Sequence, residues 1–509
     1  MGFGKLEKDD KLILLVIILF SLAIRILFWG INSAEYTDGI VQITLFENEN
    51  KFWPPMYTFL IKFLELFGID GISAGKIISI SSGVLTLIPI FLLSFKLWGR
   101  RTAIFSAILF SIAPMSLRWN IRVMTDSLFV FLSTLIFYLS FVTFVSIENN
   151  SKLRKSIIPF SVAVFLTPIL ILTRYQGVLF LPFIFLCYFF ICKNNRRVEI
   201  LPIISLISFV LIFIWLQYRG VGHSVQFVER AGTSLTDVLK NYATVFESFV
   251  AYMPYFLTYP VFILMIYAFC REDFSDSNKK FLLYFTLYYF FALLILQTMF
   301  QSFQERYFYP IVPFVSIFAG RGIDLLIVAV RFIERIKRRI NATATIAIRY
   351  ILIILSFTYI IVLGLAVLYF QRDAFGDLRR SAEFLKSVEP NAIIFSNENN
   401  HTLPACIKDK FWSRRKVELL TNDYIFGDQF LPGGSYLCLH SAYGGLNNFG
   451  ALLMTLKKRY TLEEMYSTQS VIYPIFPDIM QEPYFHQNPL ALTMKYTKQT
   501  FYSYVFRIK

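Results

Sequence analysis

The sequence predicts a polytopic α-helical membrane protein of about eleven spans, followed by a small α/β domain. Three observations predict this fold class. The 509 residues are 56% hydrophobic and only 16% charged, whereas soluble domains are closer to about 25% charged. The apolar residues come in runs long enough to cross a bilayer, where a helix satisfies its own backbone hydrogen bonds. From about residue 371 the composition changes, and no run of that length follows.

The expected spans are runs of about 15 to 22 predominantly apolar residues. The first run follows the short charged start "MGFGKLEKDDK" and lacks a small-residue cleavage site, so we expect it to be kept as a span. In chain order the expected spans are 12–30, 72–95, 102–117, 127–147, 157–172, 178–192, 198–217, 255–270, 281–299, 308–329 and 350–370.

The basic residues of the loops predict the orientation. One alternating set of loops carries most cations: Lys96, Arg100, Arg101, Lys152, Arg154, Lys155, Lys193, Arg196, Arg197, Lys279, Lys280, Arg331, Arg335, Lys337, Arg338 and Arg339. The positive-inside rule places these loops and the N-terminus in the cytoplasm, with the protein in the inner (plasma) membrane. The net charge of +15 is then mostly a matter of topology. A nucleic-acid partner is disfavoured, because these cations sit in short loops between spans.

Residues 371–509 are expected to form a separate α/β domain on the outer, periplasmic or extracytoplasmic side, after a membrane domain of residues 1–370. A helical pattern opens this part and is broken at Pro390-Asn391, after which "AIIF" reads as a buried strand. Further strands are expected at "SYLCLHS" and in the terminal "ALTMKYTKQTFYSYVFRIK", which contains an expected hairpin.

An acidic pair opens the first outer loop, "SAEYTDGIVQ". If residues 35–46 are helical, Glu35 and Asp38 share one face, and Pro54-Pro55 ends that helix and directs the chain back to the membrane. The ordinary alternative is a polar loop at the membrane interface, where an aspartate needs no special role.

Other outer loops carry arginines against the charge bias. Arg122 and Asp126 lie in "LRWNIRVMTDSLF", Arg174 in "LTRYQG" and Arg306 in "FQERYFYP". Each has a plain alternative. Asp126 can cap a helix, Arg174 can extend along apolar surface to water, and Arg306 can pair with Glu305. Together, however, these residues gather at the level where a lipid-linked phosphate lies. Charged groups at such a level are functional candidates by default.

The motifs resemble the GT-C class of integral membrane glycosyltransferases, in particular the branch of bacterial protein O-mannosyltransferases and the lipid A aminoarabinose transferase. The resemblance covers most of residues 10–395. It rests on the acidic motif, "PPMY" at 54–57, "GRRTAIFSAILFSIAP" at 99–114, "MTDSLFVF" at 124–131, "LTRYQG" at 172–177 and "ERYFYPIVPFVSIFAGRG" at 305–322.

This resemblance implies a hexosyl- or pentosyltransferase that uses a sugar on a polyprenyl phosphate. The first-loop acid is then the base, which we assign to Asp38 with Glu35 beside it, and Asp126 matches the second acid. Arg174 matches the basic residue near the donor phosphate. We add Arg306, Arg122 and Lys51 as further phosphate contacts. The family's first-loop acids are usually adjacent, whereas here they are separated.

A phosphate leaving group needs charge neutralisation more than a proton donor, so one base and several cations suffice for single displacement with inversion. The expected partners are the lipid-linked donor, a lipid, glycan or protein acceptor, and the bilayer. The sequence has no cluster with metal-ligand spacing, so no cofactor is expected, with a divalent metal left open.

Two other classes stay open. A lipid-linked sugar flippase or ion-coupled transporter would place its charges near the midplane and often shows inverted repeats. A polysaccharide polymerase or ligase would use outer arginines but would not need the acidic pair after the first span.

Overall fold

The computed structural model describes residues 6–35, 37–46, 53–148, 153–194, 243, 246–247, 257–299, 305–336, 342–370, 372–373, 376–389, 392–397, 417–441, 446–472 and 499–509. The chain forms two compact units. Unit 1 contains residues 1–28, 49–367 and 476–494, and unit 2 contains residues 29–48, 368–475 and 495–509. The segment 29–48, which carries Glu35 and Asp38, therefore groups with the C-terminal part of the chain.

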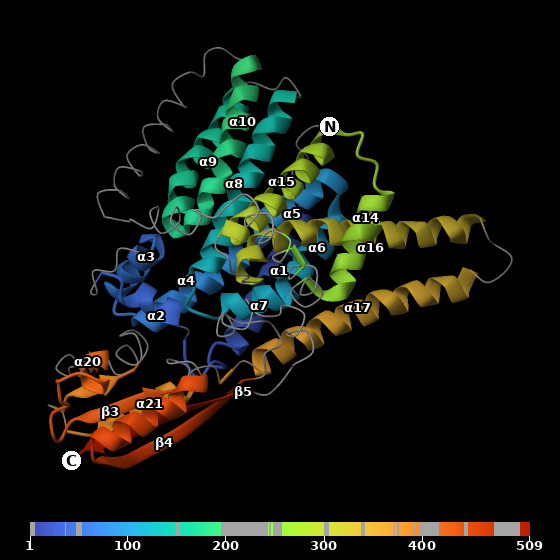
Figure 1. Ribbon diagram of the computed structural model, residues 1–509. Helices are drawn as coiled ribbons and strands as arrows, with labels where there is room; N and C mark the ends of the chain where they lie inside the picture. The colour runs from blue at the N-terminus through green and yellow to red at the C-terminus, as the bar shows by residue number, and fades with distance from the viewer. Residues whose placement is uncertain are drawn as a thin grey trace. The chain divides into compact units, whose positions relative to one another are not determined.

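Unit 1 is built from helices (Figure 1). Among them, α8, α9 and α10 pack side by side. The described helices are α1 (Lys8–Leu27), α3 (Met56–Glu65), α4 (Gly71–Leu85), α5 (Leu87–Trp98), α6 (Arg100–Ile112), α7 (Pro114–Asn120), α8 (Thr125–Glu148), α9 (Leu153–Thr173), α10 (Phe180–Asn194), α14 (Tyr259–Arg271), α15 (Ser277–Met299), α16 (Val312–Ile336), α17 (Ala342–Phe370) and the 3₁₀ helices η1 (Tyr175–Leu179) and η3 (Glu305–Ile311).

The expected polytopic helical membrane protein is confirmed. Every expected span other than 198–217 overlaps a helix, and 198–217 lies outside the described residues. Within the described part, five helices are long and apolar enough to cross a membrane, or six if the bent pair α6–α7 counts as one span. The expected total of about eleven stays a prediction.

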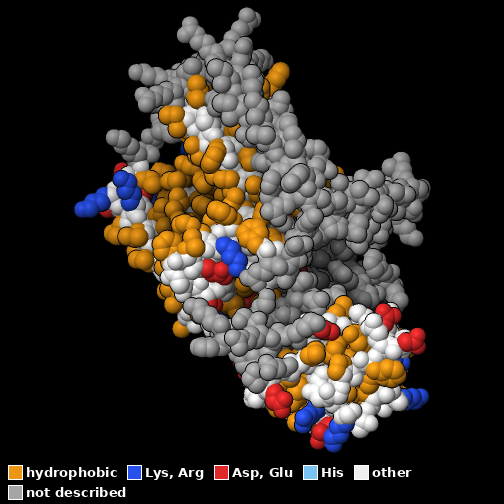
Figure 2. All heavy atoms as spheres, turned by 90° about the vertical axis from the view of Figure 1, so that its left-hand side faces the viewer, with side chains coloured by type: hydrophobic (Ala, Val, Ile, Leu, Met, Phe, Trp, Pro, Cys, Tyr) orange, Lys and Arg blue, Asp and Glu red, His pale blue; other side chains and the backbone are white. Residues whose placement is uncertain are grey.

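The outward faces of several helices are strongly hydrophobic. Figure 2 shows hydrophobic side chains gathered over one face of the helical part. On α3, α9 and α10 the exposed apolar side chains include Phe59, Phe63, Phe165, Phe185 and Phe189, each at least 50% exposed. Exposed apolar surface of this extent is typical of a protein whose solvent is lipid.

Small residues set the close packing of α16. A Cβ added at Gly320 would lie 2.3 Å from Ser106 Oγ of α6, and one added at Gly322 would lie 2.2 Å from the carbonyl oxygen of Leu264 in α14. The glycines of "FAGRG" therefore let α16 approach two neighbouring helices at once.

Arginines of two motifs, "GRRT" and "FAGRG", form ion pairs with buried carboxylates of unit 1. Arg321 donates to Glu272 at 2.6 Å and to Asp324 at 2.8 Å, and Arg101 pairs with Asp324 at 3.2 Å. Lys279 also contacts Glu272, at 2.5 Å. "GRRT" and "FAGRG" thus carry side chains that connect α6, α14, α15 and α16.

Unit 2 contains a sheet with the strand order β2-β1-β3-β5-β4. Strands β1, β2 and β3 are parallel, while β5 runs antiparallel to both β3 and β4. The described elements are α2 (Thr37–Thr44), α18 (Gly376–Ser387), β1 (Ile394–Ser396), β2 (Val417–Leu419), α20 (Asn422–Ile425), β3 (Tyr436–His440), α21 (Leu446–Arg459), β4 (Leu462–Ile472) and β5 (Gln499–Ile508).

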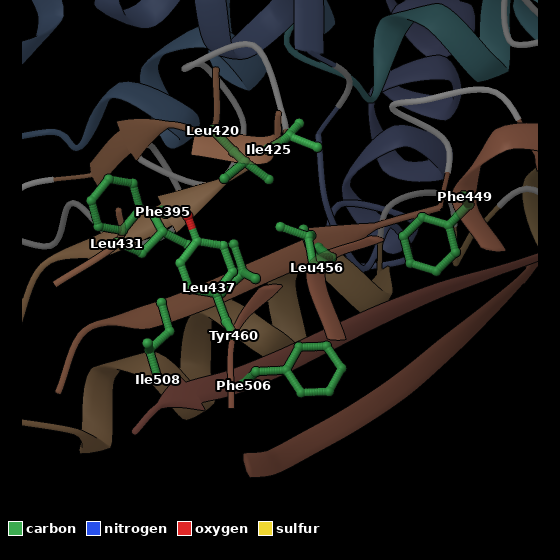
Figure 3. Packing of buried hydrophobic residues seen from close by; sticks show 11 residues of the cluster. Phe395, Leu420, Ile425, Leu431, Leu437, Phe449, Leu456, Tyr460, Phe506 and Ile508 are labelled. Atoms are coloured by element: carbon green, nitrogen blue, oxygen red, sulfur yellow. The ribbon is translucent and has the colours of Figure 1, made fainter. Parts of the chain in front are cut away.

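The sheet has an apolar core on each face, because its strands alternate side chains between the two faces. On one face, Leu456 of α21 and Tyr460, which follows the helix, pack with Leu437 and Phe506 (Figure 3). On the other face, residues of α18 pack with the sheet in a cluster of Leu378, Ala382, Leu385, Ile394, Tyr436, Cys438 and Val505. This arrangement gives three layers, with the sheet between two helices.

The strands expected at "AIIF", "SYLCLHS" and the C-terminal end correspond to β1, β3 and β5. The expected terminal hairpin falls partly on residues 473–498, outside the described part. Strand β4 was not expected. Its sequence "LEEMYSTQSVI" mixes charged and apolar residues, and its ten-residue pairing with β5 supplies the order that the local pattern lacks.

A buried acid–histidine contact ties α18 to the sheet. His440 Nε2 lies 2.8 Å from Asp377 Oδ2, with both side chains at most 1% exposed, and Ser470 Oγ donates to Asp377 Oδ1 at 2.7 Å. Burial alone would raise the pKa of Asp377. Attraction to His440 and the hydrogen bonds outweigh it and hold this pKa below its usual value of 3.8.

The lowered pKa predicts acid lability of unit 2. Because the folded-state pKa of Asp377 is below the unfolded value, its stabilisation is present above about pH 4 and is lost as pH falls through the folded pKa. Amide exchange of α18 and β3, corrected for intrinsic rates, should therefore rise below about pH 4. Asp377→Asn should raise exchange already at neutral pH and flatten this dependence. An unchanged pH dependence in the variant would contradict the assignment.

Candidate active site

Unit 1 brings Asp126 and Arg174 together as a buried ion pair. Asp126 lies in the first turn of α8, and its Oδ1 accepts from Arg174 Nη1. The side chains are only 2% and 11% exposed. Asp126 Oδ2 has no hydrogen-bond partner among the described residues. The sequence left open that Asp126 caps a helix and that Arg174 extends to water. In the structure Asp126 lies within the first turn of α8 and bonds to Arg174, and Arg174 is directed to this acid.

Arg174 and Arg306 meet at one aromatic ring, although they are far apart in sequence. The guanidinium carbon of Arg174 lies 5.1 Å from the ring centroid of Tyr307, and that of Arg306 lies 5.4 Å from it. Arg306 is 6% exposed. Cation–π contacts of this kind hold guanidinium groups in place.

The Arg174 side chain is oriented by the break between two helices. α9 ends at Thr173, Arg174 is extended, and η1 begins at Tyr175. Gly177 folds back so closely that an added Cβ would lie 2.8 Å from the backbone nitrogen of Ile171. The glycine of "LTRYQG" is therefore required by a close approach of the chain to itself.

A further arginine pair lies on the short helix α7 and the turn after it. Arg118 and Arg122 are each 2% exposed, and Arg118 lies over the Trp119 ring at 4.4 Å. α7 begins at Pro114, and α6 and α7 are bent by 55° to each other. A proline at the first helical position fits this break, because its missing N–H would be unbonded there in any case.

A buried polar network connects α7 to α1, α8 and η3. Arg25 of α1 donates to Asn120 Oδ1 at 2.9 Å and to Ser116 Oγ at 2.8 Å. Asn120 in turn donates to Ser127 Oγ at 2.8 Å and to the hydroxyl of Tyr309 at 2.9 Å. Ser127 follows Asp126, and Tyr309 lies two residues after Tyr307. The network therefore fixes the backbone that carries the acid and the arginine-binding ring.

Sequence reasoning missed this network, although Arg25 gave a signal. It is a charge inside an expected span, and such residues are functional candidates by default. Gln176 was also missed. It is 6% exposed, and neither of its side-chain polar atoms has a hydrogen-bond partner within the described ranges. Buried polar atoms without partners are costly, which is typical of groups that a ligand satisfies.

The acidic loop belongs to unit 2, and the expectation for its helix was partly wrong. The helix α2 covers Thr37–Thr44, so Asp38 lies in its first turn, whereas Glu35 precedes it in non-helical backbone. The two carboxylates therefore do not share a helical face. Glu35 is 4% exposed and Asp38 is half-buried.

Other expected features are placed as follows. Lys51 and the side chain of Glu305 lie outside the described residues. Pro55 precedes α3 as its N-cap residue instead of ending α2.

In "PPMY" the buried Tyr57 hydroxyl contacts the carbonyl oxygen of Gly75 and Ser79 Oγ, each at 2.8 Å, and so ties α3 to α4. Within the described ranges, no group of three or more His, Cys, Asp or Glu side chains is arranged to hold a metal ion.

Residues 53–218 match the model of the family described as dolichyl-phosphate-mannose-protein mannosyltransferase. The match includes Asp126, Arg174, Arg118 and Arg122. No curated protein matches the chain significantly by sequence.

Solved structures match over nearly the whole chain. ArnT from Cupriavidus metallidurans bound to undecaprenyl phosphate has a TM-score of 0.60 at 12% identity, over 89% of this chain and 96% of that one. Its apo state gives 0.56 at 11% identity, over 88% and 96%. The chain has the GT-C fold. The oligosaccharyltransferase of Archaeoglobus fulgidus, in a complex with zinc and sulfate, gives 0.53 at 11% identity, over 86% of this chain and 69% of that one.

The expected resemblance to the GT-C class is thus confirmed. At identities of 11–12% the structural likeness establishes the fold. The likeness does not establish the substrates of this chain.

Proposed function

We propose that the protein is a glycosyltransferase that moves a hexosyl or pentosyl group from a polyprenyl-phosphate donor to an acceptor on the outer face of the membrane. The observation that carries the proposal is the buried pair of Arg174 and Arg306 around Tyr307, beside Asp126, in a chain with the GT-C fold. Two guanidinium groups held by an aromatic ring suit a phosphate that leaves with a full charge.

The proposed reaction is a single displacement with inversion. Asp38 takes a proton from the acceptor hydroxyl, and the resulting oxygen nucleophile attacks the anomeric carbon. The bond from that carbon to the phosphate oxygen breaks, and its electrons leave with the polyprenyl phosphate. Arg174, Arg306 and Arg122 neutralise the leaving phosphate, and Lys51 is a further proposed contact. Glu35 orients the base or the acceptor. The reaction as written needs no metal or cofactor.

Asp126 has a separate role in this proposal. Its Oδ1 orients Arg174, while Oδ2 has spare capacity for a hydrogen bond. Gln176, two residues after Arg174 in the chain, has the same spare capacity. Hydroxyls of the donor sugar are groups of the right kind for both, because each hydroxyl both donates and accepts.

The test is a comparison of cells with and without this gene product by mass analysis of surface lipids, glycans and proteins. The proposal expects one acceptor class to lose a hexosyl or pentosyl mass and the matching polyprenyl-phosphate sugar to accumulate. A flippase predicts instead that the lipid-linked sugar accumulates on the cytoplasmic leaflet, with transfer intact once the donor is supplied outside. That outcome would contradict the proposal.

The orientation has its own prediction. We propose that the N-terminus is cytoplasmic and that unit 2 faces outward, on the basis of the loop charges. In a background with Cys192, Cys270 and Cys406 replaced by serine, a cysteine replacing the exposed Asp428 should react with an impermeant thiol reagent in intact cells or spheroplasts. A cysteine replacing the exposed Lys280 should react only after lysis. The reverse pattern would invert the topology.

A further inference from the structure

The first outer loop is bonded at Ser33 to the segment that leaves the last described membrane helix. The backbone N–H of Ser33 donates to the carbonyl oxygen of Arg372 at 2.7 Å, and its carbonyl oxygen accepts from Arg379 Nη1 at 2.6 Å. Both backbone polar groups of Ser33 are therefore bonded to a segment that lies far along the chain. Arg379 is 346 positions after Ser33. All three residues belong to unit 2.

The helix that carries Arg379 is firmly anchored to the sheet. The next residue, Arg380, donates to Thr468 Oγ1 at 3.0 Å and to the carbonyl oxygen of Gln469 at 2.6 Å in β4. It also pairs with Asp373 at 3.0 Å. The buried Asp377–His440 contact holds the same helix to β3. Arg379 thus extends from a fixed support.

The bonded residue lies close to the carboxylates in the chain. Ser33 is two residues before Glu35 and five before Asp38. Because each residue spans at most about 3.6 Å, fixing Ser33 limits where both carboxylates can be. The segment from Ser33 to Glu35 is non-helical, so it has no helical hydrogen bonds of its own to hold it.

We propose that Arg379 is a positioning residue, which holds the carboxylate-bearing loop at Ser33 in the arrangement needed for transfer. This proposal rests on the proposed function, because it assigns the loop's carboxylates to the reaction. Arg379 touches no reacting group and acts through the loop backbone. The loop is thereby coupled to the order of α18 and the sheet.

The chain offers a matched control. Arg379 Nε also donates to Glu383 Oε1 at 3.1 Å, one helical turn away, and both side chains are about half exposed. Glu383→Ala removes this intrahelical pair but leaves the donor to Ser33. Arg379→Ala removes both contacts, and Arg379→Lys keeps a cationic donor on a long side chain.

The experiment compares these three variants with the wild type as full-length protein in lipid nanodiscs. Arg379→Ala should raise amide exchange in residues 30–46 and lower kcat about 5- to 10-fold, with the donor KM changed less than about twofold, as expected for the loss of one exposed, charge-assisted hydrogen bond. Arg379→Lys should restore part of kcat, and Glu383→Ala should match the wild type.

Exchange in residues 30–46 that is the same in Arg379→Ala as in Glu383→Ala would show that Arg379 does not hold the loop. Increased exchange with unchanged kcat would show that holding the loop does not serve transfer. Either result overturns the inference. A wild-type protein without transfer from any polyprenyl-phosphate sugar would refute the proposed function instead, and the exchange data would still decide whether Arg379 holds the loop.

Discussion

Asp38→Asn is expected to lower turnover by about 10²- to 10⁴-fold while the protein still folds, inserts and binds its donor. Asparagine keeps the size of the side chain and most of its hydrogen bonding, but it cannot accept the acceptor's proton. Asp38 is half-buried in the first turn of α2, so the substitution strains no tight packing. Single-turnover kinetics with saturating donor measure the effect directly, because they separate chemistry from binding.

Glu35→Gln is the matched comparison and should lose less activity. Glu35 is 4% exposed and lies outside the helix, which suits an orienting role. Normal turnover of Asp38→Asn together with an inactive Glu35→Gln or Asp126→Asn would move the role of base to one of those residues.

Arg174→Ala is expected to weaken donor binding about 10- to 100-fold, the loss typical of a charge-assisted contact to phosphate. It should also reduce stability, because removing one member of a buried ion pair leaves the other charge uncompensated, at a cost of about 3–5 kcal/mol. The pair it breaks is 11% and 2% exposed. Binding of a labelled polyprenyl phosphate and thermal unfolding in the same detergent measure the two effects.

The double variant Arg174→Ala with Asp126→Asn separates these effects. It removes the uncompensated charge, so it should recover most of the lost stability while donor binding stays weak. Full recovery of donor binding in the double variant would mean that Arg174 serves only to neutralise Asp126. Unaltered binding in Arg174→Ala and in Arg306→Ala would exclude both arginines from the phosphate site.

The sequence predicted the helical membrane part well, because a membrane span can be recognised from the length and composition of an apolar run alone. It also singled out Asp126, Arg174 and Arg306 as candidates, since charged residues in loops between spans stand out against apolar runs, and their roles stay a prediction. It could not predict that Arg174 and Arg306 share the ring of Tyr307, because that contact depends on how two distant segments pack.

Other features depended on non-local contacts that no local pattern records. The helix α2 begins two residues after Glu35. The backbone of Ser33, which precedes this helix, bonds to Arg372 and Arg379, which lie much later in the chain. Strand β4 is ordered by its pairing with β5 rather than by its own alternation. The contacts of Arg25 were missed for a different reason, since the span 12–30 was identified by its apolar residues and its single charged residue was passed over.

The most direct test of the central claim is release of polyprenyl phosphate by the purified protein in sealed proteoliposomes, supplied with radiolabelled polyprenyl-phosphate hexoses and pentoses and an extract of envelope acceptors. We predict that one donor is converted to free polyprenyl phosphate with its label on an acceptor, and that Asp38→Asn abolishes both products together. Label that crosses the bilayer on an intact donor, with no polyprenyl phosphate released from any of the donors, would contradict the account.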